Sequence, residues 1–317
     1  MKHVMDEAFG KDWALWNGDS AEVLPQIPDA SVHLSVFSPP FSSTYTYSPS
    51  DRDLGNVPND EVFWQQFAWI SAELLRVMVP GRLVAVHVAN LPTYAIRDGA
   101  SGRKDFRGDT IRHFIEAGFV YHSEICIDKN PQAQAIRTHS KGLLFVQLNR
   151  DSAAMWQAWA DYVVVFRAPG ENPAPFKGEL SQEEWIESAR PIWQVGLPEG
   201  DGMLTPDEAK WVYPTWYGIR ETDVLSTHQA RDNDDERHLC PLQLPVIERC
   251  VRLWSAPGET VLTPFAGIGS ELVGALRHGR RAIGVELKPS YFKVAVENCQ
   301  RAEHDASLPS LFDPLPA

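Results

Sequence analysis

The chain has 317 residues, of which 44% are hydrophobic and 22% are charged, and its formal net charge is −13 at pH 7. This composition indicates a soluble globular protein with one large α/β domain or two smaller ones. The acidic charge counts against a nonspecific nucleic-acid binder that relies on its overall field, but it does not exclude DNA as a partner. No apolar run reaches the roughly 20 residues of a membrane span and residues 1–7 lack a signal-peptide core, so we expect a cytoplasmic protein. The four cysteines form no C-x-x-C pair, so we expect no metal site and no disulfide framework.

A buried strand is predicted at Val32–Phe37, after a shorter strand at residues 13–16 and a brief helix at residues 21–24. It stops at Ser38-Pro39-Pro40-Phe41, the segment called the lip below. Two prolines remove N–H donors, fix φ and force the chain out of the sheet, at the strand end where open α/β sheets bind ligands. The Ser38 hydroxyl, a main-chain carbonyl and the Phe41 ring are suited to hold a planar amine, as in the reading of a flipped nucleobase. The alternative is an ordinary turn.

Two loops follow the lip. The polar segment at residues 42–59 is long for an inert connection, which predicts a binding loop. The loop at residues 90–108 opens a basic cluster, which is either a phosphate-contacting patch or a solvated surface of mixed charge. The cluster consists of Arg97, Arg103, Lys104, Arg107 and Arg112.

Around these loops, hydrophobic periodicity predicts helices at residues 61–78 and 110–117. Strands are predicted at residues 83–88, 119–127 and 143–148. From residue 149 to about residue 237 the periodicity fades and the composition shifts to Pro, Gly, Trp and acidic residues, with an exposed linker at residues 231–237. We interpret this stretch as an inserted module.

The C-terminal part alternates helices and strands. Helices are predicted at residues 242–254, 271–278 and 289–303, and strands at residues 260–263 and 282–285. Gly267 and Gly269 allow a ligand to approach the backbone closely, and Glu286 at the end of the last strand is placed to accept hydrogen bonds from ribose hydroxyls. The third glycine of a dinucleotide-binding loop is missing, which disfavours a pyrophosphate ligand. A cofactor without phosphates, such as S-adenosylmethionine (AdoMet), fits this shorter loop better.

With both segments considered together, the chain resembles the AdoMet-dependent DNA amino-methyltransferases of the N4-cytosine/N6-adenine family over residues 13–150 and 238–300. The lip is similar to the family's (Asp/Asn/Ser)-Pro-Pro-(Tyr/Phe) catalytic motif. Residues 263–270, Thr-Pro-Phe-Ala-Gly-Ile-Gly-Ser, are similar to its cofactor motif Asp-Pro-Phe-Ala-Gly-Ser-Gly-Thr. Residues 284–287 match its ribose-binding motif, and Asn17-Gly18-Asp19 matches the Gly-Asp that commonly precedes the lip. The catalytic motif comes first, which is the order of the β group.

The resemblance implies an α/β fold: a doubly wound, mostly parallel, seven-stranded sheet of the AdoMet methyltransferase type. It implies a catalytic half at residues 1–149, an inserted target-recognition region at residues 150–237 and an AdoMet-binding half at residues 238–317. DNA would be the substrate, methylated after base flipping as in restriction–modification, and a homodimer is compatible with the family. The catalytic residues it implies are Ser38, Pro39, Pro40 and Phe41, and the AdoMet-binding residues are Asp19, Thr263, Pro264, Phe265, Ala266, Gly267, Gly269, Ser270 and Glu286.

Two departures from the family pattern bear on function. Thr263 replaces the usual Asp, which removes a carboxylate near the methionine end of the cofactor. Ser38 replaces Asp, and a Ser-Pro-Pro lip is more typical of N4-cytosine enzymes, so cytosine N4 is the preferred target and adenine N6 the alternative. A rival hypothesis is a DNA-binding module that keeps AdoMet only as a structural ligand. Asp19 either contacts adenosine or caps a helix, and we expect Lys288 to face solvent.

Overall fold

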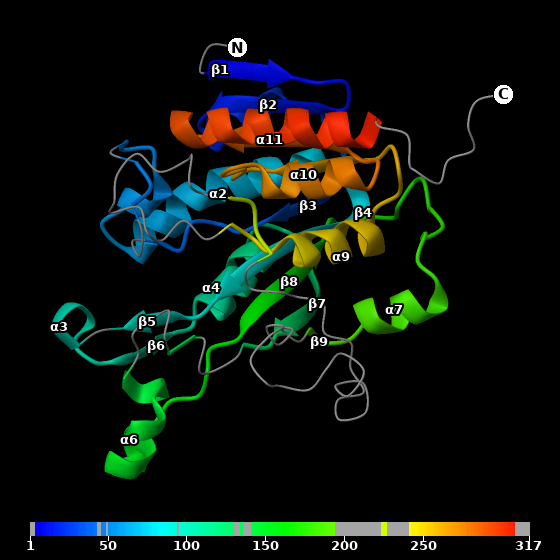
Figure 1. Ribbon diagram of the computed structural model, residues 1–317. Coiled ribbons are helices and arrows are strands. Elements are labelled where there is room, and N and C mark those ends of the chain that lie inside the picture. Colours follow the sequence, from blue (N-terminus) through cyan, green and yellow to red (C-terminus); the bar gives the residue numbers. More distant parts are fainter. Residues whose placement is uncertain are drawn as a thin grey trace.

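The computed structural model describes residues 4–42, 46–48, 50–93, 95–129, 134–135, 141–193, 223–226 and 241–307. Its centre is a nine-stranded sheet in the order β1-β2-β11-β10-β3-β4-β8-β7-β9 (Figure 1). In chain order the strands are β1 (Val4–Phe9), β2 (Trp13–Gly18), β3 (Val32–Phe37), β4 (Met78–Ala89), β7 (Val120–Ile127), β8 (Asp161–Arg167), β9 (Ile192–Trp193), β10 (Thr260–Thr263) and β11 (Arg281–Glu286).

The sheet is mostly parallel. The five strands from β2 to β4 pair parallel to one another, and β8 is antiparallel to both of its neighbours, β4 and β7. These seven strands confirm the predicted α/β sheet. The prediction of seven strands in all is too low, because β1 and β9 add one strand at each edge. The sequence did not predict these two strands because neither has the continuous apolar run of a buried strand. β1 is mostly exposed and β9 has only two residues.

Helices cover both faces of the sheet. One face packs against α1 (Ser20–Val23), α2 (Asp60–Val77) and α4 (Phe106–Glu116), and the other against α9 (Leu244–Trp254), α10 (Ser270–Arg277) and α11 (Pro289–Ser307). Among the described residues, no helix has the length and hydrophobicity that a bilayer crossing requires. The remaining short elements are η1 (Leu24–Gln26), η3 (Leu54–Asn56), β5 (Leu91–Thr93), α3 (Ala95–Asp98), β6 (Gly102–Lys104), η4 (Lys141–Leu143), α6 (Phe145–Arg150), η5 (Ser152–Ala154) and α7 (Gln182–Ser188).

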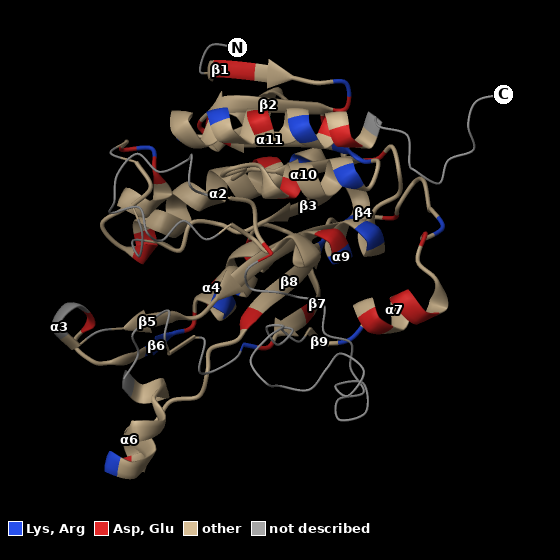
Figure 2. Ribbon diagram, in the orientation of Figure 1, with Lys and Arg blue, Asp and Glu red and all other residues tan. Residues whose placement is uncertain are grey.

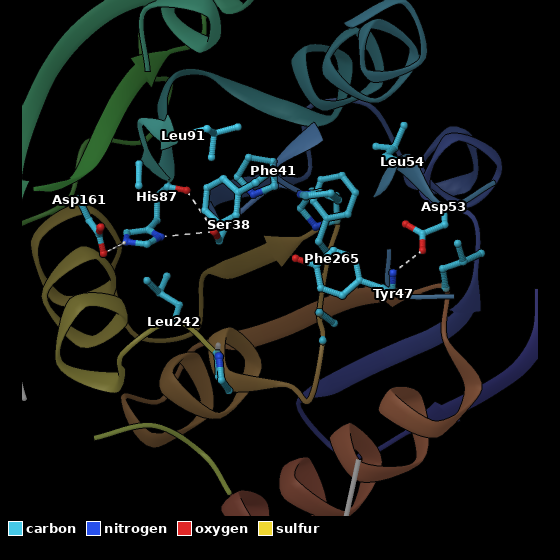
Figure 3. A pocket seen from close by; sticks show the side chains of 18 of the residues that line it. Ser38, Phe41, Tyr47, Asp53, Leu54, His87, Leu91, Asp161, Leu242 and Phe265 are labelled. Atoms are coloured by element: carbon cyan, nitrogen blue, oxygen red, sulfur yellow. Dashed lines mark hydrogen bonds and ion pairs between the residues drawn. The ribbon is translucent and has the colours of Figure 1, made fainter. Parts of the chain in front are cut away.

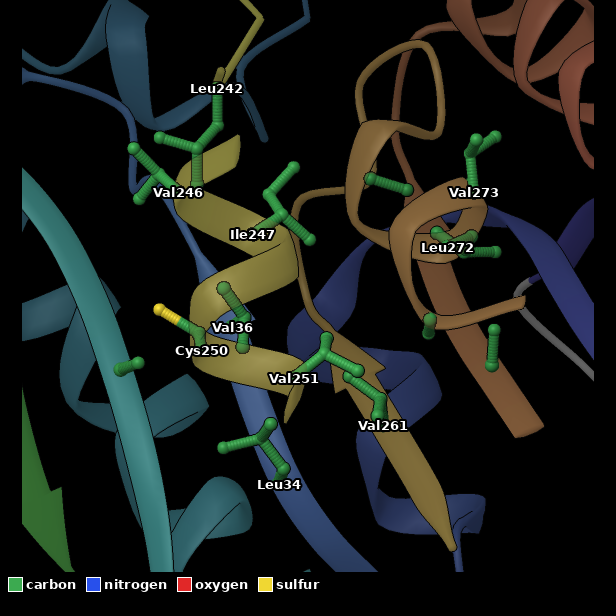
Figure 4. Packing of buried hydrophobic residues seen from close by; sticks show 14 of the residues in the cluster. Leu34, Val36, Leu242, Val246, Ile247, Cys250, Val251, Val261, Leu272 and Val273 are labelled. Carbon is green, nitrogen blue, oxygen red and sulfur yellow. The ribbon is translucent and has the colours of Figure 1, made fainter. Parts of the chain in front are cut away.

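A hydrophobic core lies on each face of the sheet, because the strands are buried on both faces. Along β8, Val163 and Val165 belong to the cluster with α9 to α11, whereas Val164 and Phe166 belong to the cluster with α2 and α4. This alternation follows from the two-residue period of a strand. Figure 4 shows the first cluster, where the apolar stripe of α9 lies over β3 and β10. Each fully buried aliphatic side chain stabilises the fold by about 1.5–3 kcal/mol.

Two predicted segments differ from the structure. Residues 143–148 form the end of η4 and part of α6 instead of a strand. Phe145 and Val146 are exposed there, and a short apolar run does not distinguish a strand from a helix. The predicted insertion at residues 150–237 contains β8 and β9, which are strands of the central sheet, so the boundary predicted at residue 150 falls before two strands of that sheet. Residues 194–222 and 227–240, including the predicted linker, lie outside the described residues.

The strand order places the lip beside the glycine loop. β3 and β10 are parallel neighbours, with Leu262 opposite Ser35, so their carboxyl ends meet at the same edge of the sheet. From this pair, β3 continues through α2 to β4 on one side, and β10 continues through α10 to β11 on the other. The two connections cover opposite faces and leave a crevice at the switch point, where open α/β sheets bind ligands.

Candidate active site

A pocket of about 1740 Å³ opens at this switch point. All four residues of the lip line it, and so do Asp19, Ser270, Glu286 and the segment Pro264–Gly267. A single small-molecule site usually has a volume of about 300–1,000 Å³, so this pocket has room for a cofactor together with a second planar ligand. Two predicted cofactor residues do not line the pocket. Thr263 is buried in β10, and Gly269 acts through the backbone at the start of α10.

The lip is held at both ends (Figure 3). Ser38 Oγ lies 3.2 Å from the main-chain oxygen of His87 and 3.3 Å from its Nδ1. At the other end, Ser42 has a left-handed backbone with φ 49°, and its Oγ donates to Asp60 Oδ1 at 2.6 Å. Phe41 packs edge-on against Phe106, with 5.8 Å between ring centroids, and borders the pocket. The lip is therefore a rigid edge with a hydroxyl and an aromatic ring beside the cavity.

Behind Ser38 lies a buried polar chain that the sequence analysis missed. His87 Nε2 is 3.2 Å from Asp161 Oδ2, and Lys129 Nζ is 2.8 Å from the same oxygen. Burial opposes the ionisation of Asp161, but the hydrogen bonds from His87 and Lys129, together with the positive charges that these side chains carry when protonated, outweigh it and lower the pKa of this carboxyl to about 2. Asp161 is therefore ionised at neutral pH. In the sequence, the hint of this polar chain was His87, a histidine near the end of the otherwise apolar predicted strand Leu83–Val88.

The glycine loop is arranged around Glu286. Gly267 and Gly269 have φ 52° and φ 88°, which favour glycine. A Cβ on Gly267 would meet no atom within 4 Å, so this loop leaves open space for a ligand, whereas a Cβ on Gly269 would lie 3.2 Å from Ala295 Cβ. Glu286 Oε2 accepts from Gly267 N at 2.7 Å and Oε1 accepts from Lys288 N at 2.8 Å. The carboxylate thus braces the loop and the turn after β11, and it lines the pocket.

A family model described as DNA methylase, N6_N4_Mtase, matches residues 32–297, which include the lip, the glycine loop and Glu286. The chain belongs to this N6/N4 family of DNA methylases. The Type II methyltransferase M.Cfr9I of Citrobacter freundii is 24% identical over 304 residues, which cover 90% of this chain and 87% of that protein. M.BglI of Bacillus subtilis is 28% identical over 186 residues, 58% of this chain but only 40% of M.BglI.

Solved structures agree with this assignment. TTHA0409, a putative DNA modification methylase of Thermus thermophilus solved in complex with AdoMet, superposes with a TM-score of 0.57 at 26% identity, covering 90% of this chain and 92% of that one. The cytosine-N4-specific PvuII DNA methyltransferase superposes with a TM-score of 0.58 over 96% of both chains, and at 16% identity it shows the fold alone. The N6/N4 methylases use AdoMet as their methyl donor.

The pocket of this methylase chain suits AdoMet. Ser270 Oγ is buried, belongs to a residue that lines the pocket, and has no hydrogen-bond partner among the described residues. Glu271, which the sequence analysis also missed, is buried in the first turn of α10 and lines the pocket. Burial is the main cause that raises the pKa of its carboxyl to about 8, and the charge of Glu286 adds to the shift. An unpartnered hydroxyl and a buried carboxyl group that a cation would ionise are suited to a polar, cationic ligand.

Side-chain hydrogen bonds connect the segments that surround the glycine loop. Asn17 Nδ2 donates to Glu286 O at 2.7 Å and Leu287 O at 3.0 Å, so it joins the ends of β2 and β11. Asp19 caps α1 by accepting from Ala21 N at 2.9 Å, and it also lines the pocket. The prediction that Lys288 faces solvent is wrong, because this side chain is buried, lines the pocket and lies over the Tyr291 ring at 4.4 Å.

The polar loop after the lip forms another wall of the pocket, through Tyr47 and the residues around Asp53. Asp53 organises the loop by accepting three main-chain hydrogen bonds, from Tyr47 at 2.8 Å, Ser48 at 2.6 Å and Gly55 at 2.8 Å. The predicted binding loop therefore lies where a ligand in the pocket would contact it.

Most of the basic cluster pairs with nearby carboxylates. Figure 2 shows where the Lys and Arg positions and the Asp and Glu positions lie along the ribbon. Lys104 pairs with Asp60, and Arg107 and Arg112 pair with Glu124 and Asp109 at 2.6 and 2.5 Å. Arg103 lies over the Trp159 ring at 5.2 Å. Trp159 and Trp156 are stacked on each other and line the pocket. These contacts favour a surface of mixed charge, in which Arg103 lies over one of two stacked tryptophans that line the pocket.

Proposed function

We propose that this chain methylates the exocyclic amino group of a DNA base, with cytosine N4 as the preferred target. The supporting observation is that the lip and the glycine loop, about 225 residues apart in the chain, line one pocket large enough for both ligands. Bound AdoMet supplies an electrophilic methyl group on its sulfonium. The acceptor amine is a weak nucleophile because its lone pair is delocalised into the base ring.

The lip would activate this amine. Its N–H groups donate to Ser38 Oγ and to the Pro39 carbonyl, which draws the nitrogen toward tetrahedral geometry. These hydrogen bonds strengthen as positive charge develops on the nitrogen, so they stabilise the transition state more than the ground state. Phe41 stacks on the base, and the stiff lip holds the amine in line with the methyl donor. A base reaches this lip only after it leaves the DNA stack.

The choice of cytosine follows from Ser38, because a Ser-Pro-Pro lip is more typical of N4-cytosine enzymes. To test the activity, duplex DNA is incubated with the protein and labelled AdoMet, digested, and its nucleosides are identified by mass spectrometry. We expect N4-methylcytosine. N6-methyladenine instead would keep the reaction class and reverse the base preference. Label on RNA or protein only, or AdoMet binding without transfer to any of the three, would contradict the proposal.

Glu271 is proposed to replace the carboxylate that Thr263 does not provide, by pairing with the ammonium group of AdoMet. An adjacent cation favours the ionised carboxylate, so AdoMet binding at about pH 7.5 should release a proton from Glu271, whose pKa is raised to about 8. We expect calorimetry in buffers of different ionisation enthalpy to show this release in the wild type and its loss in Glu271→Gln.

Methylthioadenosine, which lacks the amino-acid part of AdoMet, provides the control for Glu271. Its affinity should be the same in the wild type and in Glu271→Gln, whereas AdoMet should bind roughly tenfold more weakly to the variant, as expected for a lost ion pair of about 1.4 kcal/mol. Equal weakening of both ligands would show that Glu271 acts only on the shape of the pocket.

A further inference from the structure

Four polar side chains from different strands converge beside the lip. Ser38 follows β3, His87 is near the end of β4, Lys129 follows β7 and Asp161 begins β8. β8 runs antiparallel to β4 and β7, with Asp161 opposite both Ala89 and Ile127, so its first residue lies at the same edge of the sheet as the carboxyl ends of the others. All four side chains line the pocket, and Figure 3 shows the chain from Ser38 through His87 to Asp161.

The ionised carboxylate determines which imidazole nitrogen carries hydrogen. Asp161 is an acceptor only, so His87 Nε2, 3.2 Å away, must be the donor. In the neutral imidazole the other nitrogen then has a free lone pair. The Ser38 hydroxyl has two acceptors on His87, the main-chain oxygen at 3.2 Å and this nitrogen, Nδ1, at 3.3 Å. Lys129 Nζ contacts the same Asp161 oxygen at 2.8 Å, and its positive charge favours the ionised carboxylate. The lip hydroxyl therefore lies next to a base that is oriented by a buried carboxylate.

We propose that His87 accepts, through Ser38, the proton that the base amine loses on methylation. This inference rests on the proposed DNA methylation. The amine nitrogen forms a bond to the methyl carbon as the carbon–sulfur bond breaks, and the electron pair of that bond stays on sulfur. The nitrogen then gives a proton to Ser38 Oγ, which passes its own proton to His87 Nδ1. The imidazolium is stabilised by Asp161 and later returns the proton to water.

This transfer from the amine through Ser38 to His87, called the relay below, lets the proton leave a partly buried site. Without a base, the proton must leave through water that the stacked DNA base and the lip exclude. Ser38 would serve both as the acceptor that activates the amine and as the bridge to His87. His87 acts through Ser38, and we class it as a positioning residue. Asp161 fixes its tautomer, a role that resembles the carboxylate in Ser-His-Asp sites, although here the serine is not the nucleophile.

The test compares single-turnover methylation of duplex DNA by the wild type, His87→Ala and His87→Gln. We expect each variant to be slower by about 100-fold, the lower range for a lost acid–base group, with unchanged AdoMet affinity. Added imidazole should restore the rate of His87→Ala and not that of Ser38→Ala. His122→Ala is the matched control, because His122 Nδ1 also contacts a serine, Ser123 Oγ at 3.0 Å, but is exposed. We expect it to keep the wild-type rate.

A readout without turnover is the ¹⁵N spectrum of His87 in the free protein. We expect hydrogen on Nε2 and none on Nδ1, and a shift of the Nδ1 signal in Ser38→Ala. The opposite tautomer, or a loss of rate in folded His87→Ala that imidazole does not restore, would overturn the relay. His87 variants at the wild-type rate would also overturn it while the proposed DNA methylation stands. If the wild type methylates no DNA, both proposals fail.

Discussion

Replacing Ser38 by alanine is expected to lower the rate of methyl transfer by about 100- to 1000-fold, the usual cost of removing one hydrogen-bonding group that acts in the transition state. Ser38 Oγ is the side-chain acceptor of the lip and lies 3.3 Å from His87 Nδ1. The substitution removes that acceptor and leaves the prolines and Phe41 in place. AdoMet affinity should be unchanged, because the residues proposed to bind it lie at the ends of β2, β10 and β11 and at the start of α10. Single-turnover kinetics and calorimetry measure the two quantities separately.

Ser101→Ala is the matched control for this prediction. Ser101 is exposed and lines the same pocket from the segment between α3 and β6, so its variant should keep the wild-type rate. If Ser38→Ala methylates DNA as fast as the wild type, the lip has no role in the chemical step. If Ser38→Ala instead loses AdoMet binding, the lip supports the shape of the pocket and not the amine.

Glu286→Gln is expected to weaken AdoMet binding roughly 100-fold, or about 3 kcal/mol. The carboxylate accepts main-chain hydrogen bonds from Gly267 and Lys288, at 2.7 and 2.8 Å. A glutamine accepts only one of them and turns an N–H₂ group toward the other donor. The glycine loop loses its brace, and the proposed contact to the ribose hydroxyls is lost as well. Methylthioadenosine should be weakened equally, which separates Glu286 from Glu271.

The binding of AdoMet by the wild type should also depend on pH through Glu286. Burial is the main cause that raises the pKa of this carboxyl to about 7. The ionised form accepts the N–H and hydroxyl donors, so protonation competes with the ligand and the Kd should rise as the pH falls below about 7. In Glu286→Gln this part of the pH dependence should disappear. Calorimetry between about pH 6 and pH 8 measures this dependence. Glu116→Gln is the control, because Glu116 is exposed. An unchanged pH dependence in Glu286→Gln would contradict this role of Glu286.

Several elements were predictable because local patterns define them. The apolar stripe of α2 carries Phe63, Phe67 and Ile70 at helical spacing, and Asn59 caps the helix by accepting from Val62 N at 3.0 Å. The glycine loop was predictable because its positive φ angles at Gly267 and Gly269 require glycine. By contrast, residues 143–148 were wrongly predicted as a strand, because a short apolar run is compatible with either structure.

The sequence by itself determined the two motifs, their order and the elements that carry them, since turns, glycines and periodicity act over a few neighbouring residues. The tertiary structure alone decided which distant side chains meet. His87 and Asp161 are 3.2 Å apart because β8 inserts antiparallel between β4 and β7, and no local pattern encodes that pairing. The same holds for Glu271 and Lys288, which the packing of α10 and α11 against the sheet brings to the pocket. Strand order and direction depend on burial summed over the whole sheet, so they appear only once the chain is folded.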